Sequence, residues 1–143
     1  MERLPQAVLF ACNFNTVRSV MAVGLMKLRF DKRIWTDSCG VRLPAEPDLF
    51  VAEVMDEVGV DVTRHRPKTF DDLDDLNFDM IVSLTPEAHH RALELTRTLA
   101  APVEYWPTFD PTLIEGSRAH RLEEYRAVRE GLNARIAQRF RLD

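Results

Sequence analysis

The chain has 143 residues, 45% of them hydrophobic, and a formal net charge of −4 at pH 7. Its size and apolar content suit one ordinary hydrophobic core, so we expect residues 1–143 to form a single domain. The acidic balance argues against non-specific nucleic-acid binding, which depends on a basic face. The two cysteines are too few for a disulfide framework or a cysteine-based metal site, and we expect a reduced, cytoplasmic setting.

The sequence indicates neither a signal peptide nor a membrane span. Residues 1–5 lack a long apolar core, and no run approaches the roughly eighteen apolar residues that a span requires. We therefore expect a soluble protein without membrane attachment. The charge is uneven, since residues 46–79 hold eleven acidic against three basic side chains, whereas residues 1–45 hold seven basic against three acidic. An anionic ligand is thus favoured near the basic part.

The first third of the chain alternates between apolar runs and amphipathic segments. Residues 7–11 predict a buried strand, and the apolar spacing over residues 20–30 predicts a helix. Residues 34–39 predict a second strand, which Gly40 ends. The run between the first strand and the first helix, residues 12–19, is therefore expected to form a strand-to-helix turn.

The middle of the chain carries cap and loop signals. Residues 41–47 contain two prolines and predict a loop, because proline is excluded from helix interiors. Asp48 is the predicted N-cap of the helix that follows. Thr69 and Asp72 resemble a capping pair and predict a short acidic helix that ends near Leu76.

The last part of the chain repeats the alternation. Residues 80–84 predict the third strand, and Thr85, followed by proline, caps a helix that reaches about Ala100. Residues 103–106 predict a short fourth strand. Apolar residues at helical spacing then predict a long terminal helix over residues 122–140.

Strands that alternate with helices predict an α/β fold, a three-layer sandwich in which a four-stranded parallel sheet is flanked by helices. Ligands of such sheets bind beyond the carboxyl ends of the strands. The run at residues 12–19 and the loop around Asp110 both follow strands at that edge. We expect these two segments to converge on one cleft.

The run from Cys12 to Ser19 combines an anion-binding loop with a nucleophile. Backbone N–H groups of a loop that enters a helix N-terminus point inward, and the helix dipole adds positive potential there. A cysteine in this place ionises readily, so Cys12 is a candidate nucleophile. Arg18 can fold back and offer its planar fork to two oxygens of a tetrahedral oxyanion. Ser19 supplies a hydroxyl that can hydrogen-bond the sulfur.

This arrangement resembles the phosphate-binding loop of the low-molecular-weight protein tyrosine phosphatase family, whose signature Cys-x5-Arg-Ser follows the first strand. The resemblance runs from Val8 to about Phe140. Further residues match the family pattern at the corresponding positions: Asn15, Met21, Ala22, Asp110 and Pro111. Related arsenate reductases share this fold and loop.

The resemblance implies a cysteine-dependent phosphomonoester hydrolase, first of all a protein tyrosine phosphatase, that works through a phosphocysteine without a metal or other cofactor. Cys12 would attack phosphorus, and Asp110 would act first as a general acid and then as a base. A phosphotyrosine protein or a small aryl phosphate would be the substrate, and phosphate or vanadate would inhibit. The residues that would bind the phosphate are Asn13, Phe14, Asn15, Thr16, Val17, Arg18 and Ser19.

Three residues would support the loop from behind. Asn15 tolerates the left-handed backbone that a tight cradle often needs, and Ser19 would ease departure of the thiolate. In the family, a histidine in the connection after the second helix helps to hold the asparagine, and His65 stands at that position. The alternative, a surface histidine among basic neighbours, stays open at this point.

The same residue types also have purely structural explanations. Cys12 alone could be a small buried residue at the end of a strand, and Asp110 a turn residue before proline. Cys39 has no basic neighbour in sequence, and we expect it to pack in the core. His89 and His90 have no metal-ligand partner nearby, and we expect them to be solvated.

The chain departs from the family pattern at several places, including Val20 and Val23, where the family usually has proline and glutamate, and two of the departures bear on the pocket. Phe14 stands where the family usually has glycine, which lets the backbone curl close to the phosphate. Its ring either points outward, where it can contact an aromatic substrate, or distorts the cradle. The aromatic pair that often follows Asp-Pro is replaced by Thr112 and Leu113, which alters the pocket wall.

Two alternative functions stay open. Redox arsenate reductases carry two further cysteines around the third strand, but residues 82–92 contain none, so a disulfide relay there is excluded. A single-cysteine arsenate reductase that uses an external thiol is the first alternative. The second is a phosphate- or phosphotyrosine-binding module without turnover, caused by Phe14. Pure binding would need neither the nucleophile Cys12 nor the acid Asp110, and the chain retains both.

Overall fold

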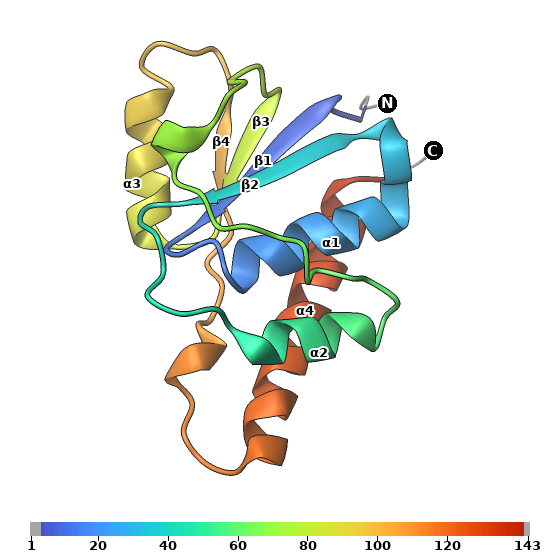
Figure 1. Ribbon diagram of the computed structural model, residues 1–143. Coiled ribbons are helices and arrows are strands. Elements are labelled where there is room, and N and C mark those ends of the chain that lie inside the picture. The colour runs from blue at the N-terminus through green and yellow to red at the C-terminus, as the bar shows by residue number, and fades with distance from the viewer. Residues whose placement is uncertain (1–3, 142–143) are drawn as a thin grey trace.

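The computed structural model describes residues 4–141 and confirms the predicted α/β fold. Within these residues, four parallel strands form one sheet in the order β2-β1-β3-β4 (Figure 1). The strands are β1 (Ala7–Cys12), β2 (Trp35–Gly40), β3 (Met80–Ser83) and β4 (Val103–Tyr105).

β1 lies inside the sheet because it pairs with both β2 and β3. All of its residues are buried. A strand covered on both faces needs a continuous apolar run rather than an alternating pattern, which explains the sequence of this segment. At its carboxyl end Cys12 pairs with Gly40 of β2, so the candidate nucleophile leaves the sheet next to a glycine.

Helices cover both faces of the sheet and complete the three predicted layers. α1 (Arg18–Phe30) and α4 (Arg118–Arg139) lie over one face, and α3 (Pro86–Leu95) lies over the other (Figure 1). α2 (Leu49–Asp56) packs against α4 and α1.

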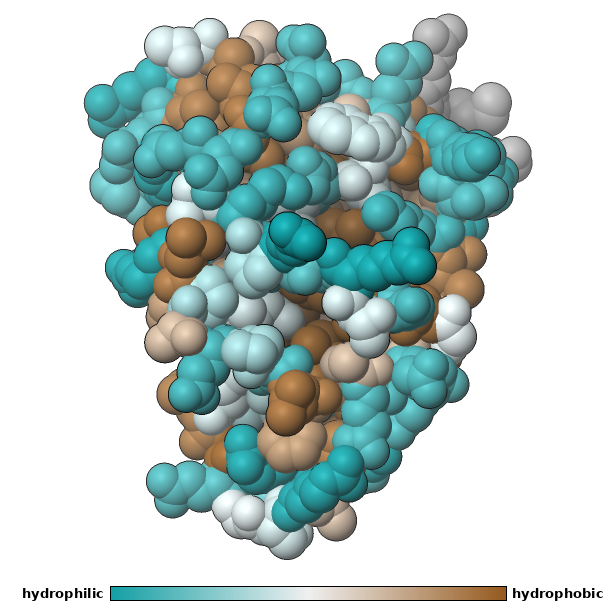
Figure 2. Space-filling view, in the orientation of Figure 1, coloured by the Kyte–Doolittle hydropathy of each residue, from teal (hydrophilic) through white to brown (hydrophobic). Residues whose placement is uncertain are grey.

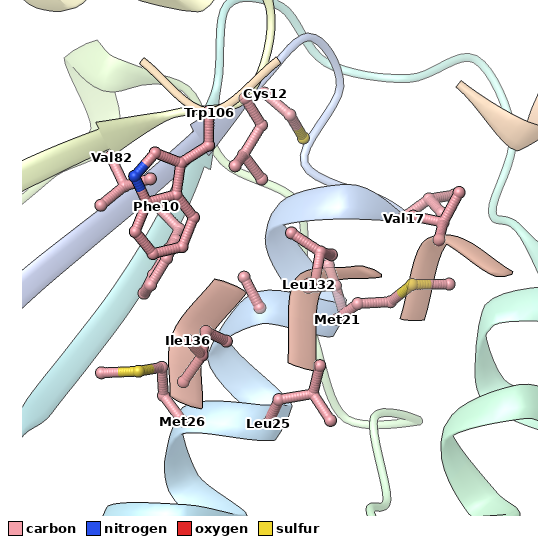
Figure 3. Close-up of a cluster of buried hydrophobic side chains, with 14 of the residues drawn as sticks. Phe10, Cys12, Val17, Met21, Leu25, Met26, Val82, Trp106, Leu132 and Ile136 are labelled. Atoms are coloured by element: carbon pink, nitrogen blue, oxygen red, sulfur yellow. The ribbon is translucent and has the colours of Figure 1, made fainter. Parts of the chain in front are cut away.

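Alternate residues of β1 supply two separate parts of the core. Val8, Phe10 and Cys12 belong to the cluster formed with α1 and α4, part of which is drawn in Figure 3, whereas Leu9 belongs to the cluster under α3. The Phe10 ring meets the Trp106 ring edge-on, with centroids 5.9 Å apart. Because Trp106 is buried and directly follows β4, this contact anchors the start of the loop that leads to Asp110.

The outer surface is mostly hydrophilic on the face seen in Figure 1. Figure 2 shows hydrophobic residues there as patches separated by hydrophilic side chains. In the part of the chain that the structure describes, no helix combines the length and the apolar character needed to cross a membrane.

Local caps determine where two of the helices begin. Asp48 accepts the backbone N–H of Val51 at 3.0 Å, and Thr85 accepts that of Ala88 at 3.1 Å. Both predicted N-caps are confirmed, and such a cap typically contributes about 1 kcal/mol. The caps matter for the site because α2 and α3 both begin at the carboxyl edge of the sheet.

The predicted acidic helix that ends near Leu76 is wrong. The structure has only a 3-10 turn, Phe70–Asp72, although the capping box between Thr69 and Asp72 is present. The chain does not continue as a helix, and the carboxylate of Asp75 accepts the N–H of Asn77 at 2.9 Å. Such a local side-chain bond competes with helical pairing.

Two helix ends also differ from the prediction. α3 ends at Leu95 rather than near Ala100, and two threonine hydroxyls donate to backbone carbonyl groups just beyond this end, at 3.1 and 3.2 Å. Such bonds give the backbone an alternative to the helix. The last helix begins before the predicted 122–140, because Ser117 caps it by accepting the N–H of His120 at 3.1 Å.

Candidate active site

The loop of residues 13–17 connects the end of β1 to the start of α1, so it wraps around a helix N-terminus. Figure 3 shows Cys12 at the edge of the buried cluster, where the strand gives way to this loop. Only 2% of Cys12 is exposed, and its Sγ lies 2.9 Å from Oγ of Ser19 in the first turn of α1. The sequence places both residues in the run of residues 12–19, and the structure brings their side chains into contact.

A chain of hydrogen bonds determines which way the Ser19 hydroxyl points. The backbone N–H of Lys68 donates to Oδ1 of Asn15 at 3.1 Å, and Nδ2 of Asn15 donates to Oγ of Ser19 at 2.9 Å. Because Ser19 Oγ accepts this bond, its own hydrogen is available to the sulfur of Cys12. A donor at the sulfur stabilises a thiolate both as nucleophile and as leaving group.

Asn15 occupies the left-handed turn of the loop. Its φ is 56°, and the residue is fully buried. A non-glycine residue in this region costs about 1–3 kcal/mol, so the surroundings must hold it in place. The predicted asparagine therefore supports the loop through both its backbone and its side chain.

His65 lies behind Asn15. Its Nε2 is 2.7 Å from the carbonyl oxygen of Asn15, which can only accept, so this nitrogen carries the hydrogen. Burial lowers the pKa of His65 below the ordinary value of 6.5, although the bond to Asn15 acts in the opposite direction. The imidazole is therefore neutral at pH 7 and fits its task as a single N–H donor. Of the two alternatives for His65, the structure favours support of the loop.

The carbonyl groups of two loop residues bind partners outside the loop. The carbonyl of Asn13 accepts from the N–H groups of Val41 at 2.8 Å and Arg42 at 3.0 Å, and the carbonyl of Asn15 accepts from His65. In a trans peptide, the carbonyl and the following N–H point in opposite directions. The N–H groups that follow Asn13 and Asn15 therefore point away from these outer partners.

Gly40 lets this loop pack against the end of β2. A Cβ at this position would lie 2.8 Å from the carbonyl oxygen of Asn13 and 2.9 Å from the backbone nitrogen of Asn15. Both neighbours are backbone atoms of the loop, so neither could move without deforming it. The sequence marked Gly40 only as the end of a strand.

Arg18 joins the loop to the segment after β4. Only 8% of the residue is exposed, and Nη1 donates to the carbonyl of Thr108 at 3.1 Å. Nη2 lies 3.7 Å from Oδ2 of Asp110. The guanidinium is thus held over the loop, where a planar fork can bind two oxygens of a tetrahedral anion.

Asp110 presents one oxygen to the pocket and uses the other in a turn. Oδ1 accepts from the backbone N–H of Thr112 at 3.0 Å and from its hydroxyl at 2.7 Å. Asp110 therefore also has the structural role that the sequence offered as an alternative, that of a turn residue before proline. Because Oδ2 faces Arg18, the turn and a role in proton transfer are compatible.

Most of the predicted residues line one small pocket or stand behind it. The pocket is lined by Cys12, Phe14, Thr16, Val17, Arg18, Asp110 and Thr112. Asn15 and Ser19 are fully buried and stand behind it. The side chain of Asn13 turns away, and its Oδ1 accepts the hydroxyl of Thr85 at 2.7 Å. The loop around Asp110 therefore converges with the Cys12 loop, as expected.

Phe14 points outward, toward solvent and the rim of the pocket. The residue is 39% exposed, and the guanidinium carbon of Arg42 lies 5.9 Å from the centroid of its ring. The backbone bonds of Asn13 and Asn15 on either side are in place. Of the two alternatives, the structure selects the outward ring at the pocket rim.

Cys39 and the histidines of α3 take no part in the pocket. Cys39 is fully buried in the cluster under α3, on the face of the sheet opposite to Cys12, and burial is the main reason why its pKa is raised far above the ordinary value. The expectation of core packing is confirmed. His89 stacks on Tyr105 and bonds the Ser83 hydroxyl at 2.8 Å, so it is not simply solvated. Among the described residues, no group of three or more His, Cys, Asp or Glu side chains could hold a metal ion.

Sequence reasoning missed four residues that position the site: Gly40, Lys68, Thr85 and Thr108. The first leaves room for the loop, and the other three donate to or accept from Asn15, Asn13 and Arg18. Two of them act through backbone groups, which carry no sequence signal. Only the glycine at the end of an apolar strand could have been found, as a place of close backbone approach.

The chain is similar over most of its length to solved structures with different named activities. An arsenate reductase from Archaeoglobus fulgidus is 27% identical, with a TM-score of 0.61, and the match covers 90% of this chain and 98% of that one. A low molecular weight protein tyrosine phosphatase from T. tengcongensis is 24% identical, with a TM-score of 0.74 and coverage of 90% and 93%. The YwlE arginine phosphatase from Geobacillus stearothermophilus is 22% identical, with a TM-score of 0.71 and coverage of 91% and 87%.

No curated protein matches the chain in sequence. The model of the family described as "Low molecular weight phosphotyrosine protein phosphatase" matches residues 7–140. This match includes the loop with Cys12 and Arg18, the turn with Asp110, and the strands and helices that position them. The chain therefore belongs to the low molecular weight phosphotyrosine protein phosphatase family.

Proposed function

We propose that this protein hydrolyses phosphomonoesters, above all phosphotyrosine, through a phosphocysteine intermediate on Cys12. One observation carries the proposal: a single pocket holds a sulfur with a hydroxyl donor, a buried guanidinium and a carboxyl group. Nucleophilic displacement at phosphorus needs these three groups, one to attack, one to bind the equatorial oxygens and one to move a proton. Family membership supports a cysteine-based phosphatase or a related enzyme.

In the first step, Sγ of Cys12 attacks phosphorus while the substrate oxygens are bound by Arg18 and by inward N–H groups of the loop. The S–P bond forms and the bond from phosphorus to the aryl oxygen breaks. The carboxyl of Asp110 gives its proton to that oxygen, so that the phenol leaves uncharged. Because Arg18 is already held by the carbonyl of Thr108, little reorganisation accompanies the reaction.

In the second step, Asp110 is a carboxylate and takes a proton from a water molecule. The water oxygen attacks phosphorus, the P–S bond breaks, and inorganic phosphate and the thiolate of Cys12 result. The hydroxyl of Ser19, which points at the sulfur, stabilises the departing thiolate.

The decisive experiment is hydrolysis of p-nitrophenyl phosphate by purified protein in the presence of EDTA. We expect turnover that phosphate and vanadate inhibit competitively, and that Cys12→Ser abolishes. The same variant should still bind inorganic phosphate, because the loop N–H groups and Arg18 remain. Turnover that persists in Cys12→Ser would place the nucleophile elsewhere, and turnover that EDTA removes would contradict a metal-independent route.

Arsenate reduction is the second candidate, supported by the 27% identity to an arsenate reductase. The thiolate of Cys12 would displace one oxygen of arsenate as hydroxide to form an S–As(V) bond, and an external thiolate would then attack Cys12 Sγ. This step yields arsenite and a mixed disulfide, which a second external thiol cleaves. Cys39 could not replace the external thiol, because it lies on the opposite face of the sheet.

Product analysis separates the candidates. Arsenite that forms only in the presence of an added thiol would establish the reductase, and p-nitrophenol release would establish the phosphatase. Phosphate binding without either product would leave a binding module. Phosphotyrosine and phosphoarginine peptides are the first physiological substrates to compare, since fold relatives carry both activities in their names.

A further inference from the structure

Phe14 is the aromatic residue among those that line the pocket. It belongs to the same loop as Cys12, yet its ring faces the rim, where 39% of the residue is exposed. Phe109 is close in sequence to Asp110 and is also exposed, but it does not line this pocket. A flat group bound to a phosphate in the cradle would therefore meet the ring of Phe14.

The ring of Phe14 is supported from outside the loop. The guanidinium carbon of Arg42 lies 5.9 Å from the ring centroid, and Nη2 of Arg42 lies 2.6 Å from Oε2 of Glu87. The backbone N–H of Arg42 also donates to the carbonyl of Asn13, next to Phe14, at 3.0 Å. Glu87 stands in the first turn of α3, where a carboxylate is favoured by the helix dipole.

Phe14 therefore has neighbours of two kinds. The guanidinium of Arg42, which pairs with Glu87, lies near its ring. Cys12 and Arg18 line the same pocket as Phe14. Aromatic rings attract each other in offset or edge-on geometry, and a cation over one ring adds to its hold.

We propose that Phe14, oriented by Arg42 and Glu87, is the aromatic wall of the pocket and makes the site selective for phosphate groups attached to a flat aromatic ring. This inference rests on the proposed function and assigns its specificity to the phosphate loop itself. Phe14 contacts the substrate ring, whereas Arg42 and Glu87 are positioning residues that act through Phe14. Alkyl phosphates, such as phosphoserine, would gain nothing from this wall.

The test compares two phosphonates that cannot be hydrolysed, benzylphosphonate and methylphosphonate, by isothermal titration calorimetry. The measured quantity is the ratio of their dissociation constants, because a general change in charge or loop geometry affects both ligands alike. For Phe14→Leu we expect the preference for benzylphosphonate to fall about two- to twelvefold. This range is the free energy of one aromatic pair expressed as a ratio of dissociation constants. Phe14→Tyr keeps the ring and should keep the preference.

Arg42→Gln removes the cation and its bond to Glu87, and we expect a smaller fall of about two- to fivefold. Arg91→Gln is the matched control. Arg91 also pairs with a carboxylate, Asp71, at 2.9 Å and lies over an aromatic ring, Phe70, at 5.4 Å, but none of these residues lines the pocket. Its loss should leave the ratio unchanged.

The outcomes separate this inference from the proposed function. An unchanged ratio in Phe14→Leu, or equal affinity of the wild type for both phosphonates, would overturn the aromatic wall and leave the phosphatase standing. A wild type that binds neither phosphonate nor inorganic phosphate would overturn the cradle, and the wall with it. A ratio that falls equally in Arg91→Gln would show a general effect of lost arginine and would remove Arg42 from the proposal.

Discussion

The pocket has two halves, the loop of residues 12–19 and the turn with Asp110, and the structure holds them in different ways. The loop of residues 12–19 receives hydrogen bonds from three other segments, residues 41–42, residues 65–68 and Thr85. The turn with Asp110 is tied back at Thr108, which bonds Leu84 and Arg18, and the hydrogen bonds of the Asp110 side chain run to its neighbour Thr112.

This difference separates two tasks. An oxyanion cradle works best when its donors are fixed before the substrate arrives, because reorganisation then costs little during the reaction. A general acid must reach a leaving oxygen whose position varies with the substrate, and a turn whose side-chain hydrogen bonds are local suits that. Binding and proton transfer should therefore be separable by mutation, with Arg18 as the residue common to both.

Arg18→Lys should have the largest effect, because it damages both halves. A lysine keeps the charge but loses the planar fork, and with it the simultaneous reach to phosphate and to the carbonyl of Thr108. We expect kcat/KM for p-nitrophenyl phosphate to fall by about 10²–10³ or more and phosphate to inhibit much more weakly. An unchanged inhibition constant for phosphate would show that Arg18 does not hold the anion.

Asp110→Asn should damage only one half. The asparagine can keep the turn with Thr112 but cannot donate or take the proton, so kcat should fall by about 10²-fold or more. The loss should be greater for phenyl phosphate than for p-nitrophenyl phosphate, whose leaving group needs less help. Phosphate affinity should stay near that of the wild type, and a parallel loss of affinity would contradict the separation of the two halves.

Asn15 tests whether the buried framework positions the nucleophile or only maintains the fold. Asn15→Ala puts a residue that tolerates φ 56° less well than asparagine into the turn and leaves Ser19 and Lys68 without their partner, so we expect a loss of stability of about 1–3 kcal/mol and a lower kcat. Asn15→Gly removes the side chain but relieves the backbone. Stability in the glycine variant should be nearer that of the wild type, while kcat remains low. Denaturant unfolding and steady-state kinetics measure the two effects.

The smallest expected effect concerns His65 and pH. Burial keeps its folded-state pKa below the ordinary 6.5, so the unfolded state binds more protons as the pH falls. The stability contributed by neutral His65 should be present above pH 6.5 and should be lost as the pH falls through the lower folded pKa. His65→Gln keeps an N–H donor without this titration. The difference in unfolding free energy between wild type and variant should narrow below pH 6.5, and a constant difference would contradict this account.

The sequence by itself determined the order of strands and helices, the place of the loop between β1 and α1, and the N-caps Asp48 and Thr85. These features depend on periodicity, on turn spacing and on bonds that span three residues, all of which are local. The same local reasoning predicted a helix after Thr69, but in the structure the capping box there is followed only by a 3-10 turn.

Only the tertiary structure decided how the site is assembled. The outward turn of Phe14 is one such feature. The bonds of Asn15 with His65 and Lys68, and the bond that Arg18 donates to Thr108, join residues that are 50 to 90 positions apart. Several of these bonds use backbone groups, which every residue carries, so the residue type does not predict them. The chemistry of the site could be predicted because it lies in one short run of sequence, whereas its geometry could not, because it depends on which distant segments the sheet brings to the same edge.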